Sequence, residues 1–506
     1  MKRIGERLRQ SVTGYDLVFW LLVVGCVAFA LLSYPMMKLR FDMWQHIGNI
    51  DRLIFDPNAK ITRSNWHSTW AFIIRNLGSG DVFTNATIVH RGQFILIGII
   101  IYHAAKQLFA ALLPSIEFSD DKNKEQWLSS LAISSVLVWF TIIGTVSTFQ
   151  QAWVMWYSVN YQITLAFLFL ALALFVNVVS LEQKNVSKTI KLACSLFLLV
   201  LIYLFHAGEL AYLVFYLPIL LICFSNKENY KKTLVCMVII FIVIFFAEKF
   251  YTDIRPNLVK HIFEGDFIKM KNEIKTHGTY NVQGGNRYTA NWNELYALST
   301  ILIFPIVMLA WNKFNQISKR VLLFMAASLI FCFIPNFILT AGLASLISYD
   351  NIVNRYYFAS FIFLLLPLCL YLMSSHFKIK HSPSMLILFT LMSIGLVFTY
   401  SKIINNKGVY YQNVKSITNS LDQKRVGLET SASEVESIGQ QIRAAQAQYG
   451  IENIIYCSTY DKGHIVKYVY RQENIAFYRW PEYSLFKLDE CLKYVKSENK
   501  LAVIIN

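Results

Sequence analysis

The sequence predicts a polytopic α-helical membrane protein with about eleven transmembrane helices, followed by a small C-terminal α/β domain outside the membrane. Of its 506 residues, 55% are hydrophobic and 15% are charged, whereas charged residues make up about 25% of a typical soluble domain. The mean hydropathy of +0.43 is high for a chain of this length. Apolar runs of about 20 residues, the length that crosses a bilayer, recur throughout residues 1–400.

The apolar runs define the transmembrane domain, which we expect to cover residues 1–400. The first run follows a basic N-terminus like that of a signal peptide, but it continues through Leu31, Leu32 and Tyr34, so we expect a retained anchor. The predicted spans are Tyr15–Tyr34, Phe94–Leu113, Leu128–Thr148, Ile163–Leu181, Leu192–Phe205, Leu210–Phe224, Leu234–Ala247, Leu295–Trp311, Val321–Leu339, Tyr357–Met373 and Met385–Tyr400.

The distribution of basic residues predicts the orientation of the spans. The net charge is +16, and Lys and Arg collect in the loop after every second span, for example at Lys227, Lys231 and Lys232. The connections Gln150–Asn160 and His206–Glu209 contain neither residue type. Because Lys and Arg are enriched in cytoplasmic loops, we expect a cytoplasmic N-terminus and an outer C-terminus. We attribute the positive charge to these loops and not to nucleic-acid binding.

Three polar segments then lie on the outer side: the loops 35–92 and 248–293, and the tail 401–506. The tail reads as an α/β domain, because Ser431 and Glu434 form a capping-box pattern before an amphipathic helix that ends at Gly450. Strands are expected at Asn453–Cys457, His464–Tyr470, Ile475–Trp480 and Leu501–Ile505, with a helix at Leu485–Lys496.

The cysteines predict one disulfide and no metal centre. Cys457 and Cys491 are the two cysteines outside the predicted spans, and in an oxidising compartment they would join to each other. The alternative is a pair of buried thiols on separate elements. No Cys or His spacing is typical of a metal cluster. We therefore predict no cofactor, and the sequence leaves a bound metal ion open.

The catalytic candidates are Asp42 and His46, in the loop after the first span. Asp42, Gln45, His46 and Asn49 follow helical spacing, and apolar residues occupy the opposite face. A carboxylate and an imidazole one turn apart suit general-base catalysis. The alternative is a helix that lies along the membrane interface and is polar because it is wet. A second amphipathic stretch follows, with Trp66 and Trp70 on one face and His67 beside it.

Other polar residues at the expected outer boundary are candidates for binding substrate or phosphate. Ionisable groups at this depth are costly and are therefore functional candidates, and Arg binds phosphate bidentately. The alternative is that the turn residues are simply wet and the cations anchor lipid headgroups. The candidates are Arg40, His206, Glu209, Lys249, Arg355 and Tyr356.

Taken together, this layout resembles the GT-C superfamily of polyprenyl-phosphate-dependent glycosyltransferases. The resemblance rests on Asp42 in an outer loop of amphipathic helices, on Arg355-Tyr356 at the outer mouth of a late span, and on a C-terminal outer domain. The length and the two large outer segments are similar to the phage-type O-antigen glucosyltransferases that change bacterial serotype. The resemblance implies a multi-pass protein of the bacterial inner membrane with a periplasmic C-terminus.

The resemblance also implies a reaction. Glucose would pass from undecaprenyl phosphate to a lipopolysaccharide O-antigen acceptor on the periplasmic side, with inversion of the anomeric configuration. Asp42 would accept the proton of the acceptor hydroxyl, and Arg355, Arg40 or Lys249 would stabilise the departing phosphate. The implied partners are membrane lipid, the lipid-linked donor and the glycan acceptor.

Two other classes of protein fit the same layout. An O-antigen or capsule polymerase would use a lipid-diphosphate glycan and depend on Arg instead of Asp42. A polysaccharide transporter or flippase would contain inverted repeats and paired broken helices, and we find no such repeat in the sequence.

The charge pattern gives a direct test of orientation. We expect a reporter that is active only outside the cytoplasm to work when it is fused at Asn506 and to fail within Lys227–Lys232, because the basic loops alternate along the chain. The opposite pattern of activity in whole cells would overturn the predicted topology.

Overall fold

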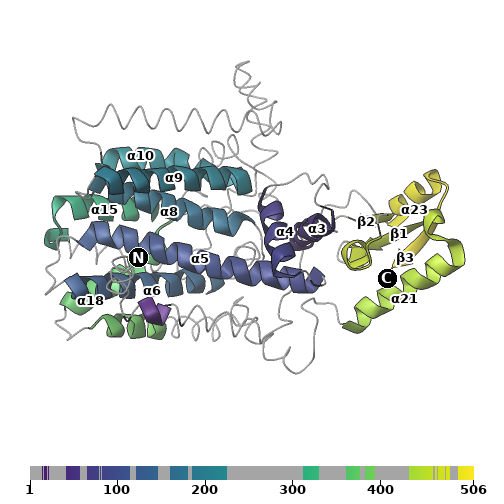
Figure 1. Ribbon diagram of the computed structural model, residues 1–506, viewed down its shortest axis with the longest axis horizontal. Helices are drawn as coiled ribbons and strands as arrows, with labels where there is room; N and C mark the ends of the chain where they lie inside the picture. The colour runs from purple at the N-terminus through teal and green to yellow at the C-terminus, as the bar shows by residue number, and fades with distance from the viewer. Residues whose placement is uncertain are drawn as a thin grey trace, which may run out of the picture. The chain divides into compact units, whose positions relative to one another are not determined.

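The computed structural model shows a chain built mainly of α-helices (Figure 1). It describes residues 14, 16–19, 21, 42–56, 65–78, 80, 82–113, 121–145, 160–180, 185–224, 311–329, 360–376, 382–393, 432–459, 462–463, 465–472, 474–478 and 488–505. The contacts divide the chain into two compact units. Unit 1 comprises Met1–Gly25, Ile95–Met155 and Asn160–Tyr411, and unit 2 comprises Cys26–Phe94, Trp156–Val159 and Gln412–Asn506.

Unit 1 contains most of the apolar helices. Helix α8 packs on α9, α6 on α18, and α10 on α15. Asn315 caps α15, because its side-chain oxygen accepts the backbone N–H of Ser318 at 2.8 Å. The elements are α5 (Val82–Leu112), of which residues 82–94 belong to unit 2, α6 (Asp121–Thr145), α8 (Asn160–Ser180), α9 (Asn185–His206), the 3₁₀ helices η2 (Ala207–Tyr212) and η4 (Trp311–Lys313), α10 (Leu213–Phe224), α15 (Gln316–Ala327) and α18 (Ile362–His376).

Three helices of the described part of the chain are long and apolar enough to cross a membrane, at Gly92–Leu112, Asn160–Ser180 and Val186–His206. They coincide with the second, fourth and fifth predicted spans. The apolar window of α9 is only 17% buried, whereas that of α8 is 72% buried. Exposed apolar residues of α9, among them Ile190, Phe197 and Val200, therefore form a surface suited to lipid.

The other predicted spans are met only in part. The sixth becomes η2 and the shorter helix α10, which contains Pro218, and the last two contain the shorter apolar helices Ile362–Met373 and Pro383–Ser393. The predicted span at 234–247, most of the first and most of the eighth lie outside the described residues. The number of eleven spans stays a prediction.

Aromatic rings fill the core of unit 1. Phe361, which directly precedes α18, lies 4.8 Å from Phe169 of α8, 5.4 Å from Phe324 of α15 and 5.7 Å from Tyr216 of α10, measured between ring centroids. All four side chains are buried. Tilted and edge-on ring pairs at these separations contribute more than their buried area alone, so this cluster holds four helices together.

A polar cluster lies elsewhere in the same unit. Lys106 Nζ of α5 lies 3.3 Å from Asp16 and 3.2 Å from Glu125 of α6. The Asp16 carboxylate also accepts hydrogen bonds from the hydroxyls of Tyr102 and Ser129. Asp16 is only 9% exposed, so its charge is compensated inside the protein. The cluster ties the N-terminal residues to α5 and α6.

In unit 2, the described part of the C-terminal region is a parallel sheet with helices. Its three strands are arranged in the order β2-β1-β3, and both α21 and α23 contact the sheet. A helix with φ near −60° cannot continue through Gly450, which has φ 77° and ends α21. The elements are α21 (Ala432–Tyr449), the 3₁₀ helix η8 (Ile451–Asn453), β1 (Ile454–Thr459), the π-helix η9 (Ile465–Val469), β2 (Ile475–Tyr478), α23 (Leu488–Ser497) and β3 (Leu501–Ile505).

One predicted strand of the tail is wrong. Residues 465–469, within the expected strand His464–Tyr470, form the π-helix η9, in which the backbone N–H of Tyr470 donates to the carbonyl of Ile465 at 3.1 Å. The Tyr470 hydroxyl donates to the carbonyl of Val435 in α21 at 2.6 Å. Ile465 and Val466 are both buried. Packing of this turn against α21 outweighs the strand preference of its β-branched residues.

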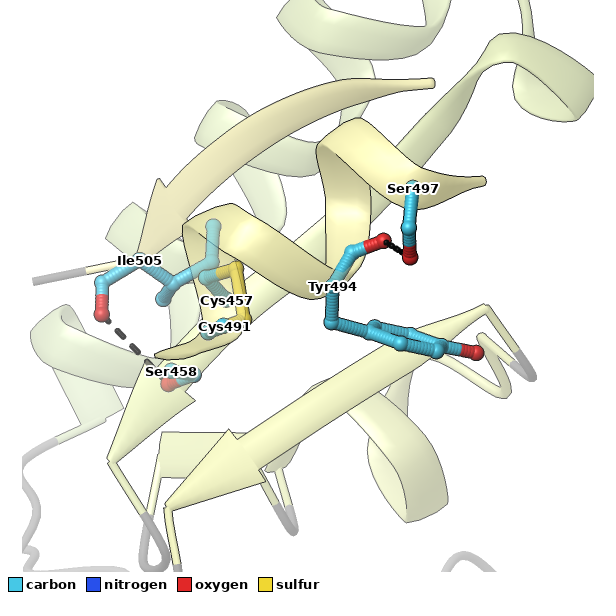
Figure 2. Close-up of a disulfide and its surroundings, with 6 residues drawn as sticks. All are labelled: Cys457, Ser458, Cys491, Tyr494, Ser497 and Ile505. Carbon is cyan, nitrogen blue, oxygen red and sulfur yellow. Dashed lines mark hydrogen bonds between the residues drawn. A yellow bond between two sulfur atoms is a disulfide. The ribbon is translucent and has the colours of Figure 1, made fainter. Parts of the chain in front are cut away.

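A disulfide joins the sheet to α23 (Figure 2). Cys457 of β1 and Cys491 of α23 are 0% and 1% exposed, and they pack with Ile455 and Val495. The bond closes a loop of 34 residues. The Ser458 hydroxyl donates to the carbonyl oxygen of Ile505 at 3.4 Å, which adds a contact between β1 and β3. This bond is the dashed line between the two residues in Figure 2.

The disulfide can be counted and its effect on stability measured. In unfolded, unreduced protein we expect six of the eight cysteines to react with a maleimide, and all eight after reduction. Replacing Cys457 and Cys491 together by Ser should lower the stability of the sheet by about 2–4 kcal/mol, because the unfolded loop gains conformational freedom. Hydrogen exchange of β1 in the full chain measures this loss. Eight reactive thiols before reduction would show that the bond does not form.

Candidate functional site

The loop residues after the first predicted span form a helix pair in unit 2. Helix α3 (Asp42–Phe55) packs on α4 (Asn65–Leu77). Ile47 and Ile50 of α3 are fully buried, as are Trp66 and Ile74 of α4, so each amphipathic helix turns its apolar face to the other. The expectation of two amphipathic helices in this segment is confirmed.

His46 lies inside this helix pair. Its Nδ1 lies 2.9 Å from Nε2 of His67, and the two rings are stacked with centroids 5.0 Å apart. The indole of Trp66 meets both rings edge-on and donates its Nε1–H to Gln93 of α5 at 2.9 Å. His46 is 5% exposed and His67 is 0% exposed. The His46 imidazole therefore packs against α4 instead of projecting into water.

Neighbouring polar groups fix the two helices in place. Arg75 of α4 donates to the carbonyls of Leu53 and Ile54, in the last turn of α3, where carbonyls have no partner within the helix. The Asn85 amide donates to the buried Asp51 carboxylate at 3.1 Å. Asp51, which is 5% exposed, thereby joins α3 to the start of α5.

Several predicted site residues lie outside the part of the chain that the structure describes. Asp42 is the first residue of α3, which places its backbone one turn before His46, but its side chain is not among the described ones. Lys249, Arg40, Arg355 and Tyr356 are likewise outside. Their roles stay predictions.

The second site lies in unit 1, where α9 ends. His206 is the last residue of α9, and the 3₁₀ helix η2 brings Glu209 back to face it. His206 Nδ1 lies 2.7 Å from one carboxylate oxygen of Glu209 and 2.9 Å from the other. Glu209 is 0% exposed, whereas the His206 side chain is 25% exposed. The structure thus brings these two predicted residues together as one acid–imidazole pair.

Helix α8 completes the environment of this pair. The Thr164 hydroxyl has its nearest acceptor in Glu209, at 2.7 Å, and the backbone carbonyls of Tyr161 and Asn160 lie farther away, at 2.9 and 3.1 Å. The Asn160 amide donates to the carbonyl of Phe205 at 2.8 Å, which satisfies a carbonyl in the last turn of α9. The hydroxyls of Tyr161 and Tyr212 lie 3.3 Å apart, and the Tyr161 ring stands edge-on to the His206 imidazole. Sequence reasoning missed Thr164, because a Thr inside an apolar run is indistinguishable from an ordinary core residue.

The chemistry of this pair follows from its burial. An isolated carboxylate is strongly destabilised where water does not reach it, unless a cation or hydrogen-bond donors compensate its charge. His206 and Thr164 supply these donors to Glu209. Only His206 of the three has a partly exposed side chain, so only His206 can meet a ligand from outside. The group is equipped for hydrogen bonding or proton transfer at the end of an apolar helix.

The described residues contain no group of three or more His, Cys, Asp or Glu side chains that could hold a metal ion. No protein-family model, no curated protein and no solved structure matches the chain. The resemblance to GT-C transferases therefore rests on the sequence alone, at Asp42 and at Arg355-Tyr356.

Thr164 provides a test of the buried pair. Thr164→Val keeps the shape of the side chain but removes the donor to Glu209, so we expect a loss of about 1–3 kcal/mol in the free energy of unfolding. Thr390→Val is the matched control, because among the described residues that buried hydroxyl donates to the backbone carbonyl of Leu386 alone, at 2.8 Å. Equal denaturation midpoints for the two variants would show that Glu209 does not need Thr164.

Proposed function

We propose that this protein is a membrane glycosyltransferase of the GT-C type, which transfers a sugar from a polyprenyl-phosphate donor to a glycan acceptor on the outer side of the membrane. The sequence resemblance implies that the sugar is glucose and that the acceptor is a lipopolysaccharide O-antigen. The proposal includes about eleven spans, a bacterial inner-membrane location, a cytoplasmic N-terminus and a periplasmic C-terminal domain.

The acid–imidazole pair at the end of α9 is the observation that carries this proposal. A buried carboxylate and a partly exposed imidazole stand next to a helix that is long and apolar enough to span a membrane. Ionisable groups in such a position lower stability, so their presence is a sign that function requires them. Reactions of a lipid-linked phosphate take place at this depth, because the lipid chain holds the phosphate at the membrane boundary.

The proposed reaction is a single displacement. Asp42 accepts the proton of the acceptor hydroxyl, and the hydroxyl oxygen forms a bond to the anomeric carbon. The bond between that carbon and the phosphate oxygen breaks, and its electron pair leaves with the polyprenyl phosphate. Cationic groups compensate the charge that develops on the phosphate, for which Arg355, Arg40 and Lys249 are the sequence candidates. One displacement inverts the anomeric configuration.

Asp42→Asn tests the proposed base. The variant keeps the size of the side chain and removes the basic oxygen, so we expect transfer to fall by roughly two to four orders of magnitude with folding unchanged. The assay is glucosyl transfer by purified protein from undecaprenyl-phosphate glucose to O-antigen. Asp56→Asn is a matched control, because Asp56 is an exposed carboxylate just after the other end of α3. Near-normal transfer by Asp42→Asn would eliminate Asp42 as the base.

Other substrates and readouts distinguish the proposed activity from that of other classes of protein. Transfer from a nucleotide sugar alone, with no polyprenyl carrier present, would exclude a lipid-linked donor. Chain extension from a lipid-diphosphate glycan would identify a polymerase instead. Movement of a lipid-linked glycan across the membrane without any new glycosidic bond would identify a flippase.

A further inference from the structure

The acid–imidazole pair leaves one ring nitrogen of His206 for a ligand. Nδ1 is engaged by both carboxylate oxygens of Glu209. For the other nitrogen, Nε2, the described residues provide no hydrogen-bond partner. The ring of Tyr161 stands edge-on to the imidazole at 6.4 Å between centroids, and the His206 side chain is 25% exposed. A molecule outside α9 can therefore reach the imidazole.

The number of protons on the His206–Glu209 pair determines whether Nε2 is a hydrogen-bond donor. In the form of the pair that has no net charge, one proton is shared between Nδ1 and the Glu209 carboxylate. Whether that proton lies on nitrogen or on oxygen, Nε2 keeps its own hydrogen. In this form a cationic imidazole, or a proton on the carboxylate itself, compensates the charge of Glu209, which is 0% exposed. Nε2–H is then a hydrogen-bond donor, which requires an acceptor atom on the ligand.

The position of His206 at the end of α9 favours a cationic imidazole, and therefore an anionic ligand. The last turn of a helix carries partial negative charge, which favours a cation there, and Glu209 attracts the same cation. A protonated imidazole forms its strongest hydrogen bonds with anionic oxygen, such as that of a phosphate. The candidate span Val186–His206 ends at this residue, which is where the phosphate of a membrane lipid would lie.

We propose that His206 Nε2–H donates a hydrogen bond to an oxygen of the phosphate monoester that leaves with the polyprenyl carrier. This assignment rests on the proposed glycosyl transfer and divides two residues that the sequence treated alike. His206 touches the phosphate. Glu209 has no exposed surface, so it does not touch substrate, and it acts as a positioning residue that holds the ring and its proton.

Chemical modification of the unmodified full chain tests the contact. Diethylpyrocarbonate reacts with the unprotonated nitrogen of an accessible imidazole, so a ligand that covers Nε2 and holds its hydrogen in place slows the reaction. Mass spectrometry of the peptides measures the modification of each His. In nanodiscs of zwitterionic lipid, we expect undecaprenyl phosphate to protect His206 at least tenfold. His103, an exposed His of the candidate span in α5, is the internal control and should react at the same rate throughout.

Two further additions distinguish the source of the phosphate. Phosphatidylglycerol supplies an anionic lipid headgroup, and inorganic phosphate supplies the same oxygens without a lipid. Protection by undecaprenyl phosphate alone supports the proposal. Equal protection by either of the other two would overturn the assignment to the carrier, and no protection by any of them would overturn the contact itself.

A variant separates the two nitrogens of His206. In His206→Asn, the side-chain amide nitrogen can take the place of Nδ1 and donate to Glu209, while the donor at Nε2 is lost. We expect its affinity for undecaprenyl phosphate to fall by about 10- to 100-fold, as for the loss of one hydrogen bond to a charged group, with an unchanged melting temperature. His103→Asn should bind like the wild type. Wild-type affinity of His206→Asn would overturn the proposal.

Binding and modification are measured without turnover, so the two proposals can fail separately. If the wild type transfers glucose but undecaprenyl phosphate protects no imidazole, the His206 contact is wrong and the transferase proposal stands. If His206 is protected by the carrier but no transfer occurs with any donor, the transferase proposal is wrong and the phosphate contact stands.

Discussion

Carboxylates that are buried between apolar helices need partners within the chain, and this requirement helps to determine how the described helices of unit 1 are joined. Glu209 obtains its partners from α9 and α8, through His206 and Thr164. Asp16 obtains them from α5 and α6, through Lys106 and Ser129. Apolar packing alone is not directional, whereas each of these pairings has a fixed geometry. The polar groups therefore select one arrangement among several that bury similar area.

A buried Asn side chain is paired in the same way between α5, α8 and α9. Asn177 of α8 donates to the carbonyl of Gln107 in α5 at 3.0 Å and accepts from Lys191 of α9 at 2.6 Å. In contrast to His206, none of these groups is needed for the proposed chemistry. Burial of a hydrogen-bonded polar group alone therefore does not identify a site. His206 differs because its ring is partly exposed and the described residues give its second nitrogen no hydrogen-bond partner.

Features that depend on local patterns could be predicted from the sequence. The presence of apolar helices at α5, α8 and α9, the amphipathic pair α3 and α4, and the strand Leu501–Ile505 all follow from hydropathy and its period. The helix ends were less predictable, because α5 and α9 begin at Val82 and Asn185, before the predicted spans Phe94–Leu113 and Leu192–Phe205. Features that depend on which distant residues meet could not. Nothing local to His46 indicates that it stacks on His67, 21 residues away. The turn at residues 465–469 has the composition of a strand, and only its packing against α21 makes it a π-helix.

The strand order β2-β1-β3 has a consequence for biogenesis. The central strand β1 pairs with β3, and Ile454 faces Leu501 in the register. During synthesis, β1 leaves the ribosome well before α23 and β3, so one of its edges stays unpaired over that interval. An open strand edge is a template for pairing with other chains. Cys457 likewise emerges before Cys491 and has to remain reduced, or be protected by an oxidoreductase, until its native partner arrives.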